Sequence, residues 1–134
     1  MTYDQILSML KEAKLPMAYD HFAEGESPAP PFMVFLFPSS DNFAADGRVY
    51  QRIDVLHVEL YTDRKQPKIE TKVETVLDRH GFFYEKSEVW IEKERMYEVL
   101  YSMQVVRTDR PTIYIQNRSG RRIIQCPKTK SNLT

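Results

Sequence analysis

The sequence predicts an α+β domain, in which an antiparallel sheet of about four strands carries two helices on one face and is followed by a basic C-terminal tail. Two segments have the apolar spacing of amphipathic helices, one near the N-terminus and one after Pro67. Four further segments have continuous or alternating apolar residues, as strands do, with two before the second helix and two after it. This order of helices and strands is what predicts the fold class.

The composition indicates a single folded domain. The chain has 134 residues, of which 42% are hydrophobic. A chain of this length can form one domain with a single core and is too short for two. The one cysteine, Cys126, excludes an intramolecular disulfide and a cysteine-based zinc site. No apolar run reaches the roughly 18 to 20 residues that cross a bilayer, and the N-terminal segment is unlike a secretory signal. We therefore expect a protein that stays in the cytoplasm where it is made.

The first helix is predicted from Tyr3 to Lys14. Thr2 and Gln5 have the spacing of a capping box, and the apolar residues that follow fall on one helical face. Because the residue before a proline disfavours helical geometry, Pro16 is expected to end the helix.

An irregular crossing and a buried strand should come next. Residues 17–31 contain three prolines and a glycine, and Tyr19 and Phe22 are expected to anchor this segment to the core. The continuous apolar run from Phe32 to Phe37 indicates a strand that is covered on both faces.

The segment from Pro38 to Gly47 is predicted to be a long loop that forms a contact surface, because it is much longer than a tight hairpin needs. The alternative is that its aromatic residue folds back onto the domain's own core. The candidate interaction residues here are Asp41, Asn42, Phe43, Asp46 and Arg48.

The stretch from Val49 to Asp63 is the longest strand candidate and the expected organiser of the sheet. Its apolar residues occupy odd positions up to Val55 and even positions from Leu56 onward. Because strand side chains alternate strictly, this change of phase predicts a bulge or a strong twist at these two residues.

A second helix and a hairpin complete the predicted domain. Pro67 is placed to open the helix and Gly81 to end it. Segments 82–91 and 97–105 should pair as an antiparallel hairpin, since the second alternates between apolar and polar residues. Beyond Pro111, two short segments resemble a smaller hairpin or a pair of extended arms, and the last residues are expected to be mobile.

Charge divides the chain into a domain, residues 1–106, and a basic extension, residues 107–134. The first has twelve Lys and Arg against eighteen Asp and Glu, and the second has seven against one. Such an excess at one end is typical of an interaction arm, although a solvated tail is the simpler alternative. The basic residues of the extension are Arg107, Arg110, Arg118, Arg121, Arg122, Lys128 and Lys130.

The sequence contains no pattern that favours an enzyme or a cofactor. Four glycines in all are too few for a phosphate-binding loop or a dinucleotide fingerprint. The three histidines lie in different predicted elements, and Cys126 has no evident partner base. The basic extension and Tyr114 leave a small RNA-binding or protein-interaction module as the alternative function, against which the acidic domain counts.

Three stretches of the chain are the most specific for a family resemblance, namely DNFAADG at 41–47, ELYTD at 59–63 and YEVLY at 97–101. With the sequence around them, they resemble a family of small tail proteins from long-tailed bacteriophages that infect Gram-positive bacteria, the tail completion or tail-to-head joining proteins. The resemblance covers roughly residues 1–106, and the basic extension lies outside it.

The resemblance implies structural work rather than catalysis. Proteins of this family are similar in fold to tail terminators, cap the tail tube, and form a hexameric ring that joins the tail to the DNA-filled capsid, without a cofactor. The implied partners are the tail tube protein, the head connector and further copies of the chain, and the implied location is the virion. A ring needs two different complementary patches, which the acidic domain and the basic extension could provide.

Overall fold

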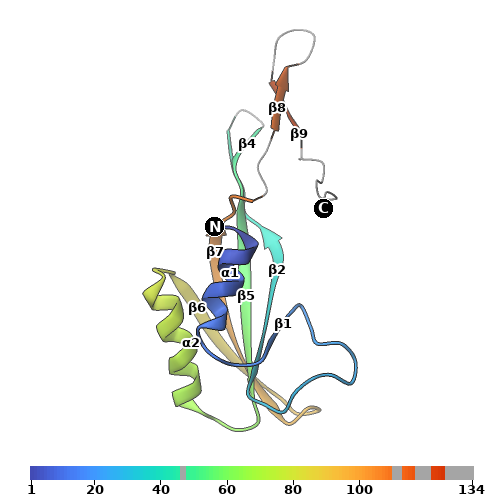
Figure 1. Cartoon of the computed structure of the whole chain (residues 1–134), viewed down its shortest axis with the longest axis vertical. Helices are drawn as coiled ribbons and strands as arrows, with labels where there is room; N and C mark the ends of the chain where they lie inside the picture. Colours follow the sequence, from blue (N-terminus) through green and yellow to red (C-terminus); the bar gives the residue numbers. More distant parts are fainter. Residues whose placement is uncertain (46–47, 110–112, 117–121, 126–134) are drawn as a thin grey trace.

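The computed structural model describes residues 1–45, 48–109, 113–116 and 122–125 of the chain. It contains two helices, a five-stranded sheet and two small two-stranded ribbons in this described part (Figure 1). In chain order the elements are α1 (Tyr3–Lys11), β1 (Met17–Tyr19), β2 (Phe32–Ser40), β3 (Phe43–Ala45), β4 (Arg48–Gln51), β5 (Ile53–Thr62), α2 (Pro67–Arg79), β6 (Tyr84–Ile91), β7 (Met96–Val106), β8 (Ile113–Gln116) and β9 (Arg122–Gln125).

The main sheet has the order β1-β2-β5-β7-β6. The α+β class is confirmed, but the sheet has five strands rather than about four, and it is mixed rather than antiparallel. The additional strand is β1, which pairs parallel with β2, while the other neighbours are antiparallel. Because β1 has only three residues, it is too short to show the alternation by which the other strands are recognised.

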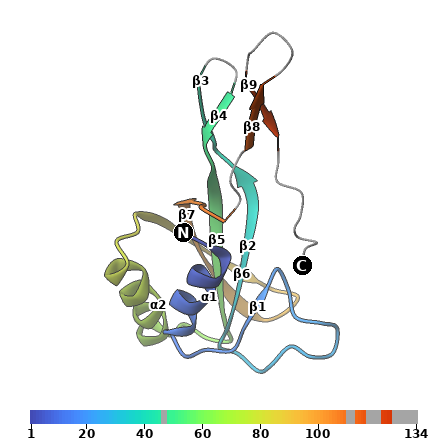
Figure 2. The same cartoon turned by 45° about the horizontal axis from the view of Figure 1, so that its top comes forward.

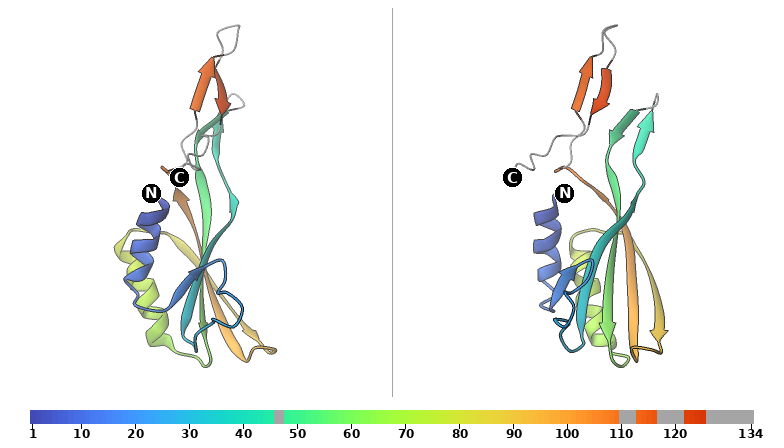
Figure 3. Two further views of the ribbon diagram at one scale, coloured as in Figure 1. Left: turned by 45° about the vertical axis from the view of Figure 1, so that its right-hand side comes forward. Right: turned by 90° about the vertical axis from the view of Figure 1, so that its right-hand side faces the viewer.

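Both helices lie on one face of the sheet (Figure 3), and the core is the layer between the helices and the sheet. The alternating residues of β5 and β7 supply the sheet side of this layer, and one stripe of each helix supplies the other side. The fully buried members include Ile6, Met9, Leu10, Met33, Phe35, Leu56, Val58, Leu60, Val73, Leu77, Val99 and Tyr101. Removing this apolar surface from water is the main stabilising contribution to the domain.

Helix α1 begins as predicted and ends earlier than predicted. The Thr2 hydroxyl accepts a hydrogen bond from the Gln5 amide, and the Gln5 side chain accepts one from the Thr2 amide, which confirms the capping box. The helix ends at Lys11, and Lys14 adopts a φ of 58°. The left-handed residue Lys14, two residues before Pro16, therefore turns the chain away from the helical path.

Helix α2 follows its prediction closely. Pro67 occupies the first turn, where its missing N–H costs no hydrogen bond, and the helix continues to Arg79. Gly81 has a φ of 78°, a conformation that side chains other than glycine adopt only with strain. The amide of Phe82 then bonds to the carbonyl of Leu77, which closes the helix end.

The organising stretch from Val49 to Asp63 is two strands, because the chain is interrupted at Arg52 between β4 and β5. Strand β5 pairs with β7 without any shift of register, so the bulge predicted within it is absent. The irregularity lies on the neighbouring strand β2. There Phe37 and Pro38 together oppose Leu56, since Leu36 pairs with His57 and Ser39 with Val55. Proline suits this position because a bulged residue need not donate to the ladder.

The predicted long loop from Pro38 to Gly47 is mostly strand. Strand β2 continues to Ser40, and β3 then pairs with β4 in an antiparallel ribbon in which Ala45 faces Arg48. This ribbon projects beyond the part of the sheet that the helices cover (Figure 2). We call β3 and β4 the arm.

The two later hairpins are confirmed. Strands β6 and β7 pair from Tyr84 with Met103 to Ile91 with Met96, and β8 pairs with β9. In β7, Val99, Tyr101, Met103 and Val105 are buried, as their alternation predicts. The prediction of a mobile chain end concerns residues 126–134, which lie outside the described part.

Candidate functional site

The base of the arm is held to the main sheet by short polar contacts. The Asn42 side-chain oxygen accepts a hydrogen bond from the amide of Ile53 at 3.0 Å, and the amide of Asp41 donates to the carbonyl of Ile53 at 2.8 Å. A carboxylate oxygen of Asp41 accepts a bond from the Gln104 side chain at 2.6 Å. These contacts come from β5 and β7, so they fix where the arm leaves the sheet.

Arg107 is the centre of this junction. Its guanidinium donates to Asp54 and to Asp109, both at 3.0 Å, and lies 4.6 Å from the centre of the Phe37 ring. The side chains of Arg107 and Asp54 are only 6% and 8% exposed, so this is a buried ion pair. Because a buried charge is costly without its partner, the pair fixes the relative position of the ends of β5 and β7.

Asp109 links the junction to helix α1. One of its oxygens accepts a bond from Arg107, and the other accepts one from the Tyr3 amide at 2.7 Å, in the first turn of the helix. Burial alone would raise the pKa of this carboxyl, but the bonds from Arg107 and Tyr3 outweigh burial, and the pKa lies below its ordinary value. The favourable partial charge of a helix N-terminus acts in the same direction.

The structure separates the predicted interaction residues into different settings. Asp41 and Asn42 lie at the base of the arm, and Phe43 and Arg48 lie on its two strands, where the description extends to their backbone pairing alone. Asp46 lies outside the described residues. The alternative that the Phe43 side chain folds back on the core concerns a side chain that also lies outside the description.

Arg107 does not belong to an exposed basic tail, because it is buried in the domain. The domain therefore extends at least to Asp109, past the predicted boundary after residue 106. Arg122 lies on β9. Five of the other predicted basic residues lie outside the described part of the chain, namely Arg110, Arg118, Arg121, Lys128 and Lys130.

The difference in net charge between the domain and the extension is the same when the domain is taken to end at Asp109. Residues 1–109 contain thirteen Lys and Arg and all nineteen Asp and Glu, and residues 110–134 contain six Lys and Arg and no acid. The domain therefore carries −6 and the extension +6.

The sheet face opposite the helices carries an acidic surface. Glu59, Glu85 and Glu98 lie on this face. Lys86, the one lysine or arginine in β2, β5, β6 and β7, lies on the helix face. Tyr61 donates a hydrogen bond to Glu59 at 2.8 Å. Burial and, next, the negative charge of Glu59 raise the pKa of the Glu98 carboxyl. A cation placed here would relieve that repulsion.

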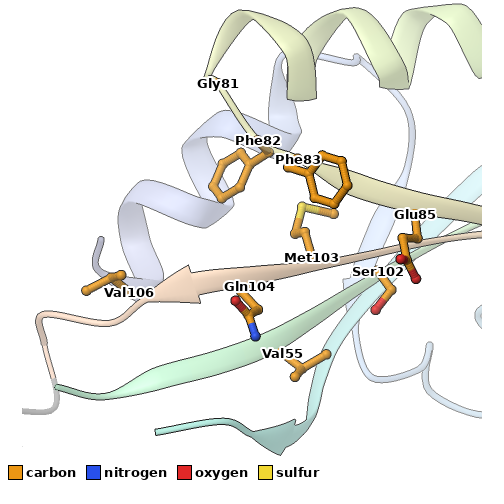
Figure 4. Close-up of a pocket in the computed structure, with 9 residues that line it drawn as sticks. All are labelled: Val55, Gly81, Phe82, Phe83, Glu85, Ser102, Met103, Gln104 and Val106. Carbon is orange, nitrogen blue, oxygen red and sulfur yellow. The ribbon is translucent and has the colours of Figure 1, made fainter. Parts of the chain in front are cut away.

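A pocket of about 670 Å³ opens where the connection from α2 to β6 passes the end of β7 (Figure 4). Phe82 and Phe83 project from this connection, and the Met103 side chain lies next to Phe83. The lining offers one hydroxyl and one carboxylate, those of Ser102 and Glu85, and no histidine, lysine or cysteine. Its lining is mainly apolar, and none of these side chains could act as a base next to the Ser102 hydroxyl other than the Glu85 carboxylate.

The surfaces just described were only partly visible in the sequence. In the sequence Arg107 looks like the first residue of a basic segment, although Asp109, two residues later, could have indicated a local ion pair. Glu59 and Glu98 both occupy polar positions of alternating strands, and nothing in their spacing shows that the strands are neighbours.

Comparison with known proteins adds no assignment. No family model matches the sequence, and no curated protein matches it. Within the described residues, neither helix is long and apolar enough to cross a membrane, and no group of three or more His, Cys, Asp or Glu is placed to hold a metal ion.

Proposed function

We propose that the chain is a structural tail protein of a long-tailed bacteriophage, which caps the tail tube and joins the finished tail to the DNA-filled capsid as a hexameric ring. It would act in the host cytoplasm during assembly and remain in the virion at the head-tail interface. The tail tube protein, the head connector and neighbouring copies would be its partners. The proposal rests on the resemblance of residues 1–106 to tail completion proteins.

The projecting arm is the structural observation that carries the proposal furthest. The arm continues the strands β2 and β5 beyond the helix-covered core, and Asp41, Asn42 and Arg107 hold its base. A rigidly based arm can reach a neighbouring subunit or the tube without loss of its direction. This geometry suits an assembly protein better than it suits an enzyme.

Charge supports contacts between neighbouring copies in the ring. The sheet face opposite the helices carries Glu59, Glu85 and Glu98, and the extension from residue 110 carries six basic residues without an acid. In a ring each copy presents two different patches, and opposite charges favour the correct pairing of these patches. The extension of one copy would lie on the acidic face of the next copy or on the connector.

Removal of residues 110–134 tests this contact. The cut falls after Asp109, so it removes β8 and β9 but leaves the Arg107 junction intact, and the truncated domain should still unfold cooperatively in urea. We expect purified tails mixed with this variant to join capsids much more slowly than tails mixed with the full chain. Joining at the normal rate would show that the extension is a solvated tail.

The double substitution of Asp41→Ala and Phe43→Ala tests the arm. We expect a folded protein that binds tails weakly and gives few infectious particles in a complementation assay. Asp41→Ala alone is the matched control, because it removes the contact with Gln104 and leaves the aromatic side chain in place. Normal tail binding and infectivity of the double variant would make the arm ordinary surface.

A further inference from the structure

Strand β6 is an exposed sheet edge that is neither short, bulged nor interrupted by proline. It is the last strand of the main sheet, it is eight residues long, and its pairing with β7 has no bulge. It contains no proline and a single lysine. Natural proteins normally shorten, bend or cover such an edge because its unpaired N–H and C=O groups invite another strand. The opposite edge, β1, has only three residues.

Exposed apolar side chains gather at the same edge. Phe83 is 84% exposed, Val89 is 52% exposed and Trp90 is 39% exposed, and all three lie in β6 or directly before it. Within residues 1–42 and 52–109, Tyr19 and Val106 are the other large hydrophobic residues with comparable exposure. A concentration of this kind at an open edge indicates a protein contact rather than chance.

The hydrogen-bond pattern shows which groups of β6 point outward. The amide of Arg107 donates to the carbonyl of Arg52. Because hydrogen-bonded positions alternate along an antiparallel pair, the backbone groups of the odd-numbered residues of β7 bond to β5. The even-numbered residues of β7 then bond to the odd-numbered residues of β6. The free backbone groups of the edge belong to Tyr84, Lys86, Glu88 and Trp90.

We propose that two copies of this chain pair through β6, antiparallel and about a two-fold axis at Ser87, so that their sheets become continuous. In this register Lys86 of each copy lies opposite Glu88 of the other, and Tyr84 lies opposite Trp90. Within each copy Lys86 already contacts Glu70 and Glu74, and Glu88 already contacts Lys65, so the two cross-copy charge pairs extend ion pairs that each copy has on its own. On the other face Glu85 lies opposite Val89, and the exposed Phe83 meets Ile91. Cross-strand pairs of opposite charge and of aromatic residues stabilise such a sheet.

Charge selects this register over its neighbours. A two-fold axis at the adjacent residues places Lys86 opposite Lys86, or Glu88 opposite Glu88, and like charges opposite each other destabilise a sheet. The axis at Ser87 also puts each outward-pointing residue opposite another one, as hydrogen bonding across the interface requires. This pairing does not depend on the proposed function, since it uses only the edge and the sequence of β6.

Cysteine cross-linking tests the register directly. In a full-length Cys126→Ser chain, Ser87→Cys places the two thiols opposite each other at a non-hydrogen-bonded position, where the separation suits a disulfide. We expect rapid formation of a covalent dimer with oxidised glutathione as the two-electron acceptor. Glu85→Cys alone should not cross-link, because its copy lies about 13 Å along the strand. A mixture of the Glu85→Cys and Val89→Cys chains should cross-link, since these positions oppose each other.

A charge variant provides a second readout that does not involve oxidation. Glu88→Lys places lysine opposite Lys86 at two places in each dimer and also removes the contact between Glu88 and Lys65 of the same copy. We expect the dissociation constant of the dimer to rise at least about tenfold in sedimentation equilibrium. Glu85→Lys makes the same charge change on the same strand, opposite Val89, and should leave the dissociation constant nearly unchanged. Circular dichroism verifies that both variants fold.

Three results would overturn the proposal. The native chain could remain a monomer at its highest soluble concentration, Glu85→Cys could cross-link as fast as Ser87→Cys, or Glu88→Lys and Glu85→Lys could have the same effect on association. Failure of tail joining with normal β6 pairing would count against the proposed function alone.

Discussion

The helix-covered core and the junction at the base of the arm are stabilised by different physical means. The core consists of apolar side chains such as Leu56 and Leu77, which are wholly buried between the helices and the sheet. The junction consists of charged and polar groups around Arg107, arranged so that each buried charge has a partner. The core should therefore respond mainly to lost volume, whereas the junction should respond to lost partners and to pH.

The largest effect is expected from Arg107→Met. This change leaves Asp54 buried without the guanidinium that neutralises it, and such losses typically cost about 3 to 5 kcal/mol. Urea denaturation should show the decrease in unfolding free energy. Arg95→Met is the matched control, because Arg95 and its partner Glu92 have side chains that are 77% and 80% exposed. If the two variants are equally stable, the junction is not held by its buried ion pair.

The next effect is expected from Leu77→Ala in the core. The side chain is fully buried between α2 and the sheet, and truncation of such a leucine costs about 2 to 5 kcal/mol, depending on how far the cavity collapses. It should cost the same free energy at pH 4 and pH 7 in denaturant titrations, because it removes no titratable group. Val106→Ala, at a site that is 42% exposed, should change stability little. A strongly pH-dependent loss in Leu77→Ala would contradict the assignment of the core as apolar.

A smaller effect should appear in the pH dependence of the junction. The pKa of Asp109 is lower in the folded protein than its ordinary value of 3.8. Its contribution to stability is therefore complete above about pH 4 and is lost as the pH falls through the lower, folded value. Asp109→Asn should be less stable than the native chain at pH 7, and the difference should shrink as the pH falls below 4.

Hydrogen exchange of the Tyr3 amide provides a local check on this prediction. Because this amide donates to Asp109, its protection should fall in Asp109→Asn more than that of the Ile6 amide, which bonds to the Thr2 carbonyl. Equal loss of protection at both amides would indicate a general weakening of α1 rather than the loss of one contact.

The smallest effect is expected from Gln104→Ala. It removes one exposed hydrogen bond to Asp41, so global stability should fall by at most about 1 kcal/mol. The arm should nevertheless become less firmly held, and the Asp41 amide, which donates to Ile53, should exchange faster. Thr71→Ala on the exposed side of α2 is the control. Unchanged exchange at Asp41 would show that Asn42 alone fixes the base of the arm.

The sequence predicted those parts of the fold that rest on local chemistry. The Thr2 cap, Pro67 and Gly81 act through neighbouring residues, and the alternation in β7 reflects burial on one face. These features appear in the structure where the residues predict them.

The errors concern features that depend on residues far apart in the chain. The phase change at Val55 and Leu56 predicted a bulge or a strong twist there, but the bulge lies on the partner strand β2, which contains Pro38. The arm was taken for a loop, since Ala44, Ala45 and Asp46 have weak strand preference and pairing across the ribbon is not visible locally. Arg107 was assigned to a tail because its partner Asp54 lies 53 residues away.

The central claim is that this protein joins tails to capsids, and electron microscopy of lysates tests it most directly. A phage from which this gene has been deleted should accumulate DNA-filled capsids and separate tails, and supply of the full chain from a plasmid should restore joined particles. Intact virions in the lysate without the protein would contradict the claim.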